Sequence, residues 1–254
     1  MLKKDYPILE FDEDKEAFIK PSNVIKHIDA PERCAMCFFD VAIEKILSEY
    51  PNKVISHFVA GSLRLPIYEI EYNGERLTLT QAGVGAPVAA AQIEELTAIG
   101  CRKFIVSGMC GVLENIPVGH LLIPTVAVRD EGASYHYIAP SREISANERI
   151  TQVLEDTLTD KEIPYIKVKT WTTDAFYRET PKKIELRKSE GCVAVEMETS
   201  AYIAVARYND VEFGQILCAG DSLAGEVWDT RGYSSRADVH EAVLRLTLEA
   251  CART

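Results

Sequence analysis

The chain has 254 residues, 47% of them hydrophobic, which suits one compact α/β domain over residues 1–254 with a large core. Its formal net charge of −11 and isoelectric point of about 5.0 argue against a general binder of nucleic acid or of anionic membranes. No secretory signal follows the two N-terminal lysines, and no apolar run approaches the roughly 20 residues that span a bilayer. We therefore expect a cytoplasmic protein that takes a small-molecule ligand and has no nucleic-acid or membrane partner.

Short apolar runs alternate with helical patterns along the chain. Strands are expected at residues 76–80, 103–107, 121–128, 165–169, 192–195 and 213–219. Helices are expected at residues 87–99, 147–158, 199–208 and 236–252. This alternation predicts an α/β fold, a single three-layer domain with a mixed, mainly parallel central sheet flanked by helices. Ligands of such folds bind at the carboxyl ends of strands, so the strand-to-loop junctions are where a site is expected.

The cysteines do not indicate a metal. Cys34 and Cys37 have the spacing of a redox or zinc pair, but no second pair and no histidine pair completes four zinc ligands. We expect these cysteines to be structural and expect no metal site.

Two junctions are rich in glycine. Gly83-Val-Gly85 precedes a predicted helix, where backbone N–H groups and the helix dipole favour an anion, although a tight turn explains the same residues. A dinucleotide fingerprint would need Gly or Ala where Val88 stands. Gly108-Met-Cys110-Gly111 ends another strand and lets the backbone pass close to a ligand.

Three further junctions carry side chains that could bind a ligand or transfer a proton. In an extended segment Glu196 and Glu198 point to one side and suit a vicinal diol, whereas at a helix start they only complement its dipole. Phe176 is able to stack on a flat ring or to pack in the core. Asp221 follows a buried strand and is either a proton donor to a leaving group or a helix cap.

Taken together, these junctions resemble the nucleoside phosphorylase family, which includes hexameric purine nucleoside phosphorylases, uridine phosphorylases and related nucleosidases. The most specific motif is V-E-M-E-x-x-A at residues 195–201. The glycine motifs at residues 83–85 and 108–111, and the segments 132–137 and 173–177, follow in the family's order. The resemblance covers nearly the whole chain and favours the binding interpretation of the two glutamates and Phe176.

The resemblance implies a role for each matching residue. Glu198 would grip the ribose hydroxyls, with Met197 packing on the sugar and Glu196 beside it. Phe176 would stack on the base. The matching residues that would line the base pocket are Cys110 and Gly111.

The family's chemistry is the cleavage of an N-glycosidic bond through a ribosyl cation. By resemblance, Asp221 would protonate or hydrogen-bond N7 of a purine leaving group, and Arg231 would assist Asp221. Thr180 and Lys182 stand near the positions where uridine phosphorylases carry a Gln and an Arg, so a purine is favoured over a pyrimidine. The family also implies a homo-oligomer, either a dimer or a trimer of dimers.

The phosphate site departs from the family's pattern. Val106 stands where phosphorylases usually have an arginine, and Met109 where they have Ser or Thr. The family's P-G-D-P-x-R loop is matched to residues 28–33, which retains Arg33, and Arg64 lies one residue from an arginine that a neighbouring subunit supplies. Valine offers neither charge nor a bidentate fork, and losing one such contact costs about 2–4 kcal/mol of transition-state stabilisation.

Two nucleophiles are therefore compatible with the sequence. Phosphate, held by Arg33, Arg64, Gly83 and Gly85, would give the free base and ribose 1-phosphate with inorganic phosphate as co-substrate and no cofactor. Water would make the protein a nucleoside hydrolase. The retained Arg33 favours phosphorolysis of a purine ribonucleoside, with a hydrolase, a uridine phosphorylase and a non-catalytic nucleoside sensor as alternatives.

Overall fold

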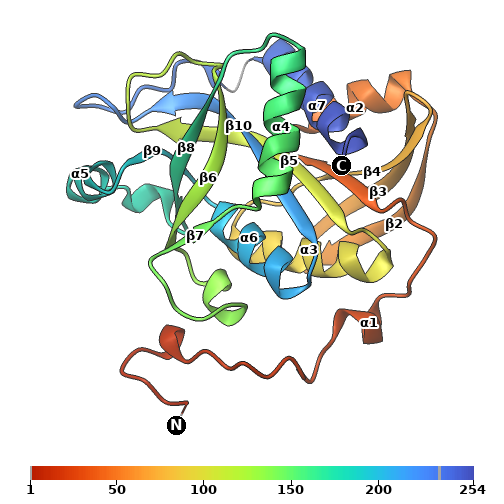
Figure 1. Cartoon of the computed structure of the whole chain (residues 1–254), viewed down its shortest axis with the longest axis horizontal. Coiled ribbons are helices and arrows are strands. Elements are labelled where there is room, and N and C mark those ends of the chain that lie inside the picture. Colours follow the sequence, from red (N-terminus) through yellow and green to blue (C-terminus); the bar gives the residue numbers. More distant parts are fainter. Residues whose placement is uncertain (1, 234–235) are drawn as a thin grey trace.

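The computed structural model describes residues 2–233 and 236–254. In these residues ten strands form one mixed sheet, in the order β10-β6-β8-β9-β5-β1-β4-β3-β2, with β7 paired to β6 (Figure 1). The strands are β1 (Arg33–Cys37), β2 (Asn52–Ala60), β3 (Leu63–Tyr72), β4 (Glu75–Gln81), β5 (Lys103–Val112), β6 (Leu121–Asp130), β7 (Glu143–Ser145), β8 (Tyr165–Thr173), β9 (Cys192–Glu196) and β10 (Glu212–Ser222). The helices are α1 (Pro21–Val24), α2 (Asp40–Glu49), α3 (Ala86–Ile99), α4 (Glu148–Asp160), α5 (Pro181–Ser189), α6 (Thr199–Tyr208) and α7 (Ala237–Ala252).

Helices cover both faces of the sheet. Helices α3 and α6 pack against each other on one face, and α2, α4 and α7 form the layer on the other face (Figure 1). The expected α/β fold with a mixed sheet and flanking helices is confirmed, and each strand and helix expected from residue 76 onward is present. In the described part of the chain no helix is long and apolar enough to cross a membrane.

The sheet closes on itself at one end, which the sequence did not predict. Strand β10 pairs with β5 in parallel and with β6 in antiparallel fashion, while β9 joins β8 to β5. Strands β5, β9, β8, β6 and β10 therefore form a ring. Because the ring brings strand ends together that would be far apart in an open sheet, residues from distant parts of the sequence meet at its rim.

The first part of the domain contains elements that sequence patterns missed. Strand β1 lies in the middle of the sheet, parallel to β4 and β5, and its residues Cys34 to Cys37 are fully buried. Its sequence is short and shows no alternation of apolar and polar residues, because a central strand is buried on both faces. Sequence patterns therefore did not identify it. The hairpin β2–β3 extends the sheet at one edge.

Helix α3 starts as its sequence predicts. Gly85 precedes the helix with φ 96°, a left-handed value that glycine adopts without strain, and Pro87 occupies the first turn. Gly100 ends the helix with φ 132°. The glycine at position 85 thus sets the direction in which the chain enters the helix layer.

Close packing between β10 and α4 makes Gly214 a sensitive position. A Cβ atom there would lie 2.3 Å from Ile150 Cγ2 and 3.2 Å from Leu154 Cδ1. We expect Gly214→Ala to lower the free energy of unfolding by about 1–3 kcal/mol through overpacking, measured by denaturant titration. Gly132→Ala is the matched control, because its added Cβ would have no neighbour closer than 3.6 Å. Equal stability of the two variants would contradict this packing.

Candidate active site

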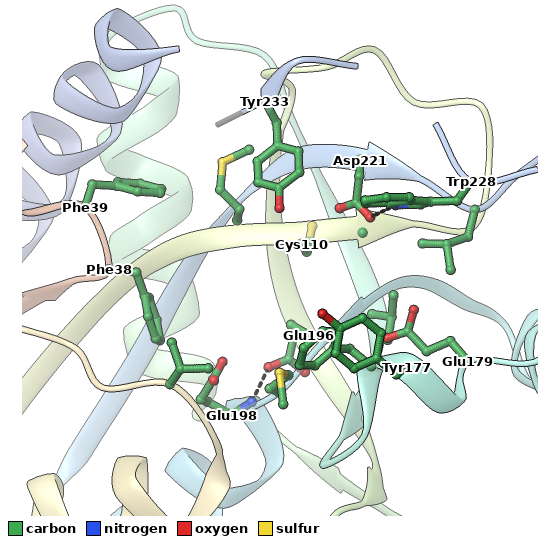
Figure 2. A pocket seen from close by; sticks show the side chains of 17 residues that line it. Phe38, Phe39, Cys110, Tyr177, Glu179, Glu196, Glu198, Asp221, Trp228 and Tyr233 are labelled. Atoms are coloured by element: carbon green, nitrogen blue, oxygen red, sulfur yellow. Dashed lines mark hydrogen bonds between the residues drawn. The ribbon is translucent and has the colours of Figure 1, made fainter. Parts of the chain in front are cut away.

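A cavity of about 670 Å³ opens where several strands end. Its walls come from the ends of β5, β9 and β10 and from the segments that follow β1, β4 and β8 (Figure 2). The lining residues are Phe38, Phe39, Val84, Met109, Cys110, Gly111, Phe176, Tyr177, Glu179, Val195, Glu196, Met197, Glu198, Asp221, Leu223, Trp228 and Tyr233. The cavity therefore brings together seven residues expected from the sequence: Cys110, Gly111, Phe176, Glu196, Met197, Glu198 and Asp221.

The buried carboxylate of Glu196 is held by the protein itself. Its Oε1 accepts the hydroxyls of Thr172 at 2.6 Å and Thr170 at 3.3 Å. Its Oε2 accepts the backbone N–H groups of Glu198 at 2.8 Å and Thr199 at 2.6 Å, the start of helix α6 (Figure 2). Burial raises the pKa of Glu196, while these donors oppose the rise. Glu196 joins β8, β9 and α6 and orients the residues after it.

Glu198 lines the same cavity, and its carboxyl group accepts fewer hydrogen bonds from the protein than that of Glu196 does. It is buried at the start of α6, and its Oε1 accepts the Gly85 N–H at 2.6 Å. Burial and the neighbouring Glu196 carboxylate raise the pKa of Glu198 to about 8. Met197 and Val195 line the cavity on either side of Glu196. The two glutamates, which the sequence predicted to bind as a pair, thus differ: Glu196 is held by hydrogen bonds within the protein, and Glu198 has fewer such bonds.

Asp221 lies at the other end of the cavity, near the end of β10. Its Oδ2 accepts the indole N–H of Trp228 at 2.6 Å (Figure 2). Arg231 is close by, but its guanidinium donates to the backbone carbonyls of Ile116 at 2.6 Å and Asp221 at 3.1 Å. Arg231 therefore contacts the main chain of Asp221 and not its carboxylate, and it does not line the cavity.

Aromatic rings and a second acid surround the space near Asp221. Phe176 and Tyr177 follow β8 with ring centroids 4.1 Å apart, and both are exposed at the rim. Cys110 is buried in β5, and burial raises the pKa of its thiol well above the ordinary value. Burial and the charge of Asp221 raise the pKa of Glu179 to about 7.

The expected phosphate ligands are not in the cavity, which corrects the interpretation of Arg33. Arg33 begins β1, at the end opposite to the cavity, and its guanidinium contacts Glu75 at 3.1 Å and the Ala252 carbonyl at 2.9 Å. The segment that follows β1 at its carboxyl end begins with Phe38 and Phe39. The motif match to residues 28–33 failed because those residues precede the strand.

The glycine loop is also occupied by the protein. The Gly83 N–H donates to Gln92 Oε1 at 2.7 Å, and the Gly85 N–H to Glu198, so these two amides do not face a phosphate. Arg64 is exposed near the start of β3 and does not line this cavity. A contribution of Arg64 to the site of a neighbouring subunit stays a prediction.

The end of the cavity near β1 is aromatic and apolar. The Phe38 ring lies against Gly108, where a Cβ atom would be 2.7 Å from Phe38 Cδ2. Met109 and Tyr233 also line the cavity, while Val106 is buried inside β5. None of the seventeen described lining residues is Lys, Arg or His, and four carry carboxyl groups. In the described residues no group of His, Cys, Asp or Glu has the arrangement to hold a metal ion.

Some lining residues were missed because their signals are weak. Phe38 and Phe39 follow a strand that the sequence did not reveal. Glu179 stands between the aromatic pair and Pro181, and Trp228 lies in the segment after Asp221. An aromatic or acidic residue directly after a strand was the available signal, but only the folded chain shows which of these face the cavity.

Similarity to known sequences covers most of the chain. Residues 32–252 match the phosphorylase superfamily. The chain belongs to this superfamily. The resemblance inferred from the motifs is thereby confirmed, and the N-terminal segment up to residue 31 lies outside the matching region.

Two relatives show how this superfamily member compares with named proteins. Guanosine phosphorylase of Halorubrum lacusprofundi is 29% identical over 206 residues, which are 77% of this chain and 83% of that protein. Uridine phosphorylase of Haemophilus influenzae is 36% identical over 107 residues, which are 41% of this chain and 42% of that protein.

Solved structures match over nearly the full length. Uridine phosphorylase from Vibrio fischeri superposes with a TM-score of 0.76 at 20% identity and covers 91% of this chain and 95% of its own. Purine nucleoside phosphorylase from Toxoplasma gondii in complex with immucillin-H gives a TM-score of 0.76 at 21% identity, covering 89% and 92%. At these identities the superpositions demonstrate a shared fold.

The raised pKa of Glu198 predicts a pH-dependent cost to stability. With a pKa of about 8 in the folded chain and an ordinary value of 4.5, Glu198 keeps its proton in the folded state while the unfolded chain has lost it. Stability conferred by the wild-type residue therefore falls as pH rises from about 4.5 to 8. We expect Glu198→Gln to remove this decline, by at most about 1.4 kcal/mol per pH unit, in melting temperatures measured from pH 5 to 8.5.

The exposed Glu185→Gln variant is the control and should keep the wild-type pH dependence. A Glu198→Gln variant that loses stability with pH as steeply as the wild type contradicts the assignment of the raised pKa. We also expect Glu198→Gln to fold as the wild type does and to lose the catalytic activity that the resemblance implies.

Proposed function

We propose that the protein cleaves the N-glycosidic bond of a purine ribonucleoside. The observation that carries the proposal is one cavity with Glu198 at one end and Asp221 at the other, and with Phe176, Cys110 and Gly111 also in its lining. A volume of about 670 Å³ is of the size that small-molecule ligands occupy. The carboxylate of Glu198 accepts hydrogen bonds from a ribose diol, and Asp221 serves the leaving base.

The reaction proceeds as charge separates between sugar and base. The electron pair of the C1′–N bond goes to the base, and a proton from Asp221 neutralises the charge that develops there. When the ribose diol binds, Glu198 releases its proton to solvent, and the resulting carboxylate accepts from the ribose hydroxyls and stabilises the positive charge on the sugar. A nucleophile then bonds to C1′; when it is water, the proton that it loses returns to Asp221, directly or through solvent, and restores the acid.

The second acid, Glu179, supports a 6-oxopurine such as guanine. Such a base carries an N1–H donor, and guanine adds the donors of its 2-amino group. An ionised Glu179 accepts both, whereas adenine presents an acceptor at N1 and is not matched. The similarity to a guanosine phosphorylase supports the same choice.

Water is the nucleophile that the cavity itself favours. A phosphate dianion would meet no cationic lining residue in the described chain, and each ionised carboxylate about 4 Å away would repel it by about 4 kcal/mol or more at an effective dielectric constant of 20. Water carries no charge and needs no arginine. We therefore propose hydrolysis to the free base and ribose.

Phosphorolysis is the second candidate, and the relatives favour it. Both the guanosine and the uridine enzymes named above are phosphorylases. For phosphate to bind here, a cation must come from outside the described cavity, as Arg64 of a neighbouring subunit would provide. The homo-oligomer expected from the family would supply such a neighbour.

Product analysis tests the proposal directly. The protein is incubated with guanosine, inosine, adenosine and uridine, with and without phosphate, and the sugar product is identified by chromatography. We expect free ribose from guanosine and inosine at a rate that does not depend on phosphate. Ribose 1-phosphate formed only with phosphate supports the second candidate. Binding of nucleosides without any product contradicts both and indicates a sensor.

Substitution of Glu179 tests the base preference. We expect Glu179→Gln to lower the ratio of kcat/KM for guanosine over adenosine by about tenfold or more, because a hydrogen bond to a charged group contributes about 1.5–3 kcal/mol. In the wild type the preference should also weaken below about pH 7, where Glu179 takes up its proton. Glu185→Gln is again the control. An unchanged ratio in Glu179→Gln rules out this role.

A further inference from the structure

The segment after β10 folds back over the cavity as a fixed loop. Ser222 and Asp229 exchange two backbone hydrogen bonds, N–H of Ser222 to O of Asp229 at 2.8 Å and the reverse at 3.0 Å. Residues 223–228 are thereby closed into a loop. Leu223 and Trp228, at its two ends, both line the cavity.

Arg231 fixes this loop at its base. Its guanidinium bonds to the carbonyls of Ile116 and Asp221, and its own N–H donates to the Asp229 side chain at 2.9 Å. The residue has φ 48°, an unusual value for arginine that these contacts maintain. Arg231 therefore acts on the geometry of the loop that carries Trp228.

Trp228 makes a hydrogen bond through the N–H edge of its indole ring, and much of the residue is exposed to solvent. Its indole N–H donates to Asp221 Oδ2 at 2.6 Å, yet 63% of the residue is exposed (Figure 2). The other tryptophan, Trp171, is 0% exposed. A large aromatic ring held at the mouth of a cavity by one hydrogen bond has a free surface for a bound ligand to cover.

The hydrogen bond also determines which oxygen of Asp221 carries the proton. An indole N–H is a donor only, so the oxygen that it contacts must accept. Because a carbonyl oxygen accepts a hydrogen bond better than a hydroxyl oxygen does, the proton of the acid form is favoured on Oδ1. A Cβ on Gly111 would lie 3.5 Å from this oxygen and 2.8 Å from Leu223 Cδ1, so a side chain at position 111 would crowd the cavity next to Asp221.

We propose that Trp228 is a positioning residue for Asp221: it binds Oδ2, directs the protonated Oδ1 at the leaving base, and covers the base with its ring. This inference rests on the proposed cleavage reaction. In the step itself the O–H bond at Oδ1 breaks, an N–H bond forms on the base, and the C1′–N electron pair stays with the base. Trp228 keeps its hydrogen bond to the carboxylate that results.

Kinetics with two leaving groups test the proposal. Trp228→Phe keeps a ring and removes the N–H donor. We expect kcat for guanosine to fall by about tens of fold, less than the factor of about 10²–10⁴ that a general acid contributes in full, with little change in KM. With 4-nitrophenyl β-D-riboside, whose leaving group departs as a stable anion and needs no proton, kcat should change less than about threefold by the same reasoning.

Two controls separate this role from a purely structural one. Val227→Ala alters the adjacent exposed residue, which does not line the cavity, and should behave as the wild type. In an Asp221→Ala background, Trp228→Phe should cause no further loss on guanosine, since a residue that acts through Asp221 is not additive with it. Equal losses on both substrates, or wild-type kcat on guanosine, would overturn the proposal.

Tryptophan fluorescence gives an independent readout. Binding of guanine should change the emission of the wild type through Trp228, and the change should be absent in Trp228→Phe while the buried Trp171 still reports a folded chain. A ligand-induced change that survives in Trp228→Phe would overturn the covering role. If the wild type cleaves neither substrate, the proposed function is wrong and this inference is wrong with it. If the wild type cleaves both substrates but Trp228→Phe lowers kcat equally for the two leaving groups, only the inference about Trp228 is wrong.

Discussion

The site depends on the burial of one carboxylate, that of Glu196. Taking such a group out of water costs several kcal/mol unless donors replace the solvent, and here four donors from β8 and the start of α6 do so. The same contacts fix where β9 ends and α6 begins. Because Glu198 is the residue that precedes α6, its direction follows from this arrangement, and the Gly85 amide at the start of α3 completes it.

The acidic residues Glu198 and Glu179, which line the cavity, both have raised pKa values. Glu198 and Glu179 are surrounded by protein and by other acids, which holds their pKa values at about 8 and about 7. Near neutral pH such groups exchange protons and accept hydroxyl or N–H donors from a ligand. These properties suit a sugar diol and a base better than they suit a phosphate dianion.

The wall of the cavity near β1 is apolar because the Phe38 ring fills the space beside Gly108. Gly108 has no side chain, and the ring of Phe38 lies in the space that a side chain would need. Val106, Met109 and Tyr233 add no charge there. The aromatic residue after β1 therefore requires glycine at position 108, because a side chain there would meet the Phe38 ring.

The sequence by itself determined most strands and helices from residue 76 onward, because apolar runs, prolines and glycines act on nearby residues; β7 and α5 were not expected. It also indicated Glu198 and Asp221 as candidate ligands, because these acids stand near the ends of expected strands and match the motifs of the family that the chain resembles. Only the tertiary structure decided which groups meet: Arg33 lies at the far end of β1, Gly85 donates to a carboxylate 113 residues away, and Trp228 reaches Asp221. These contacts depend on how strands and loops pack in three dimensions, which no local pattern encodes.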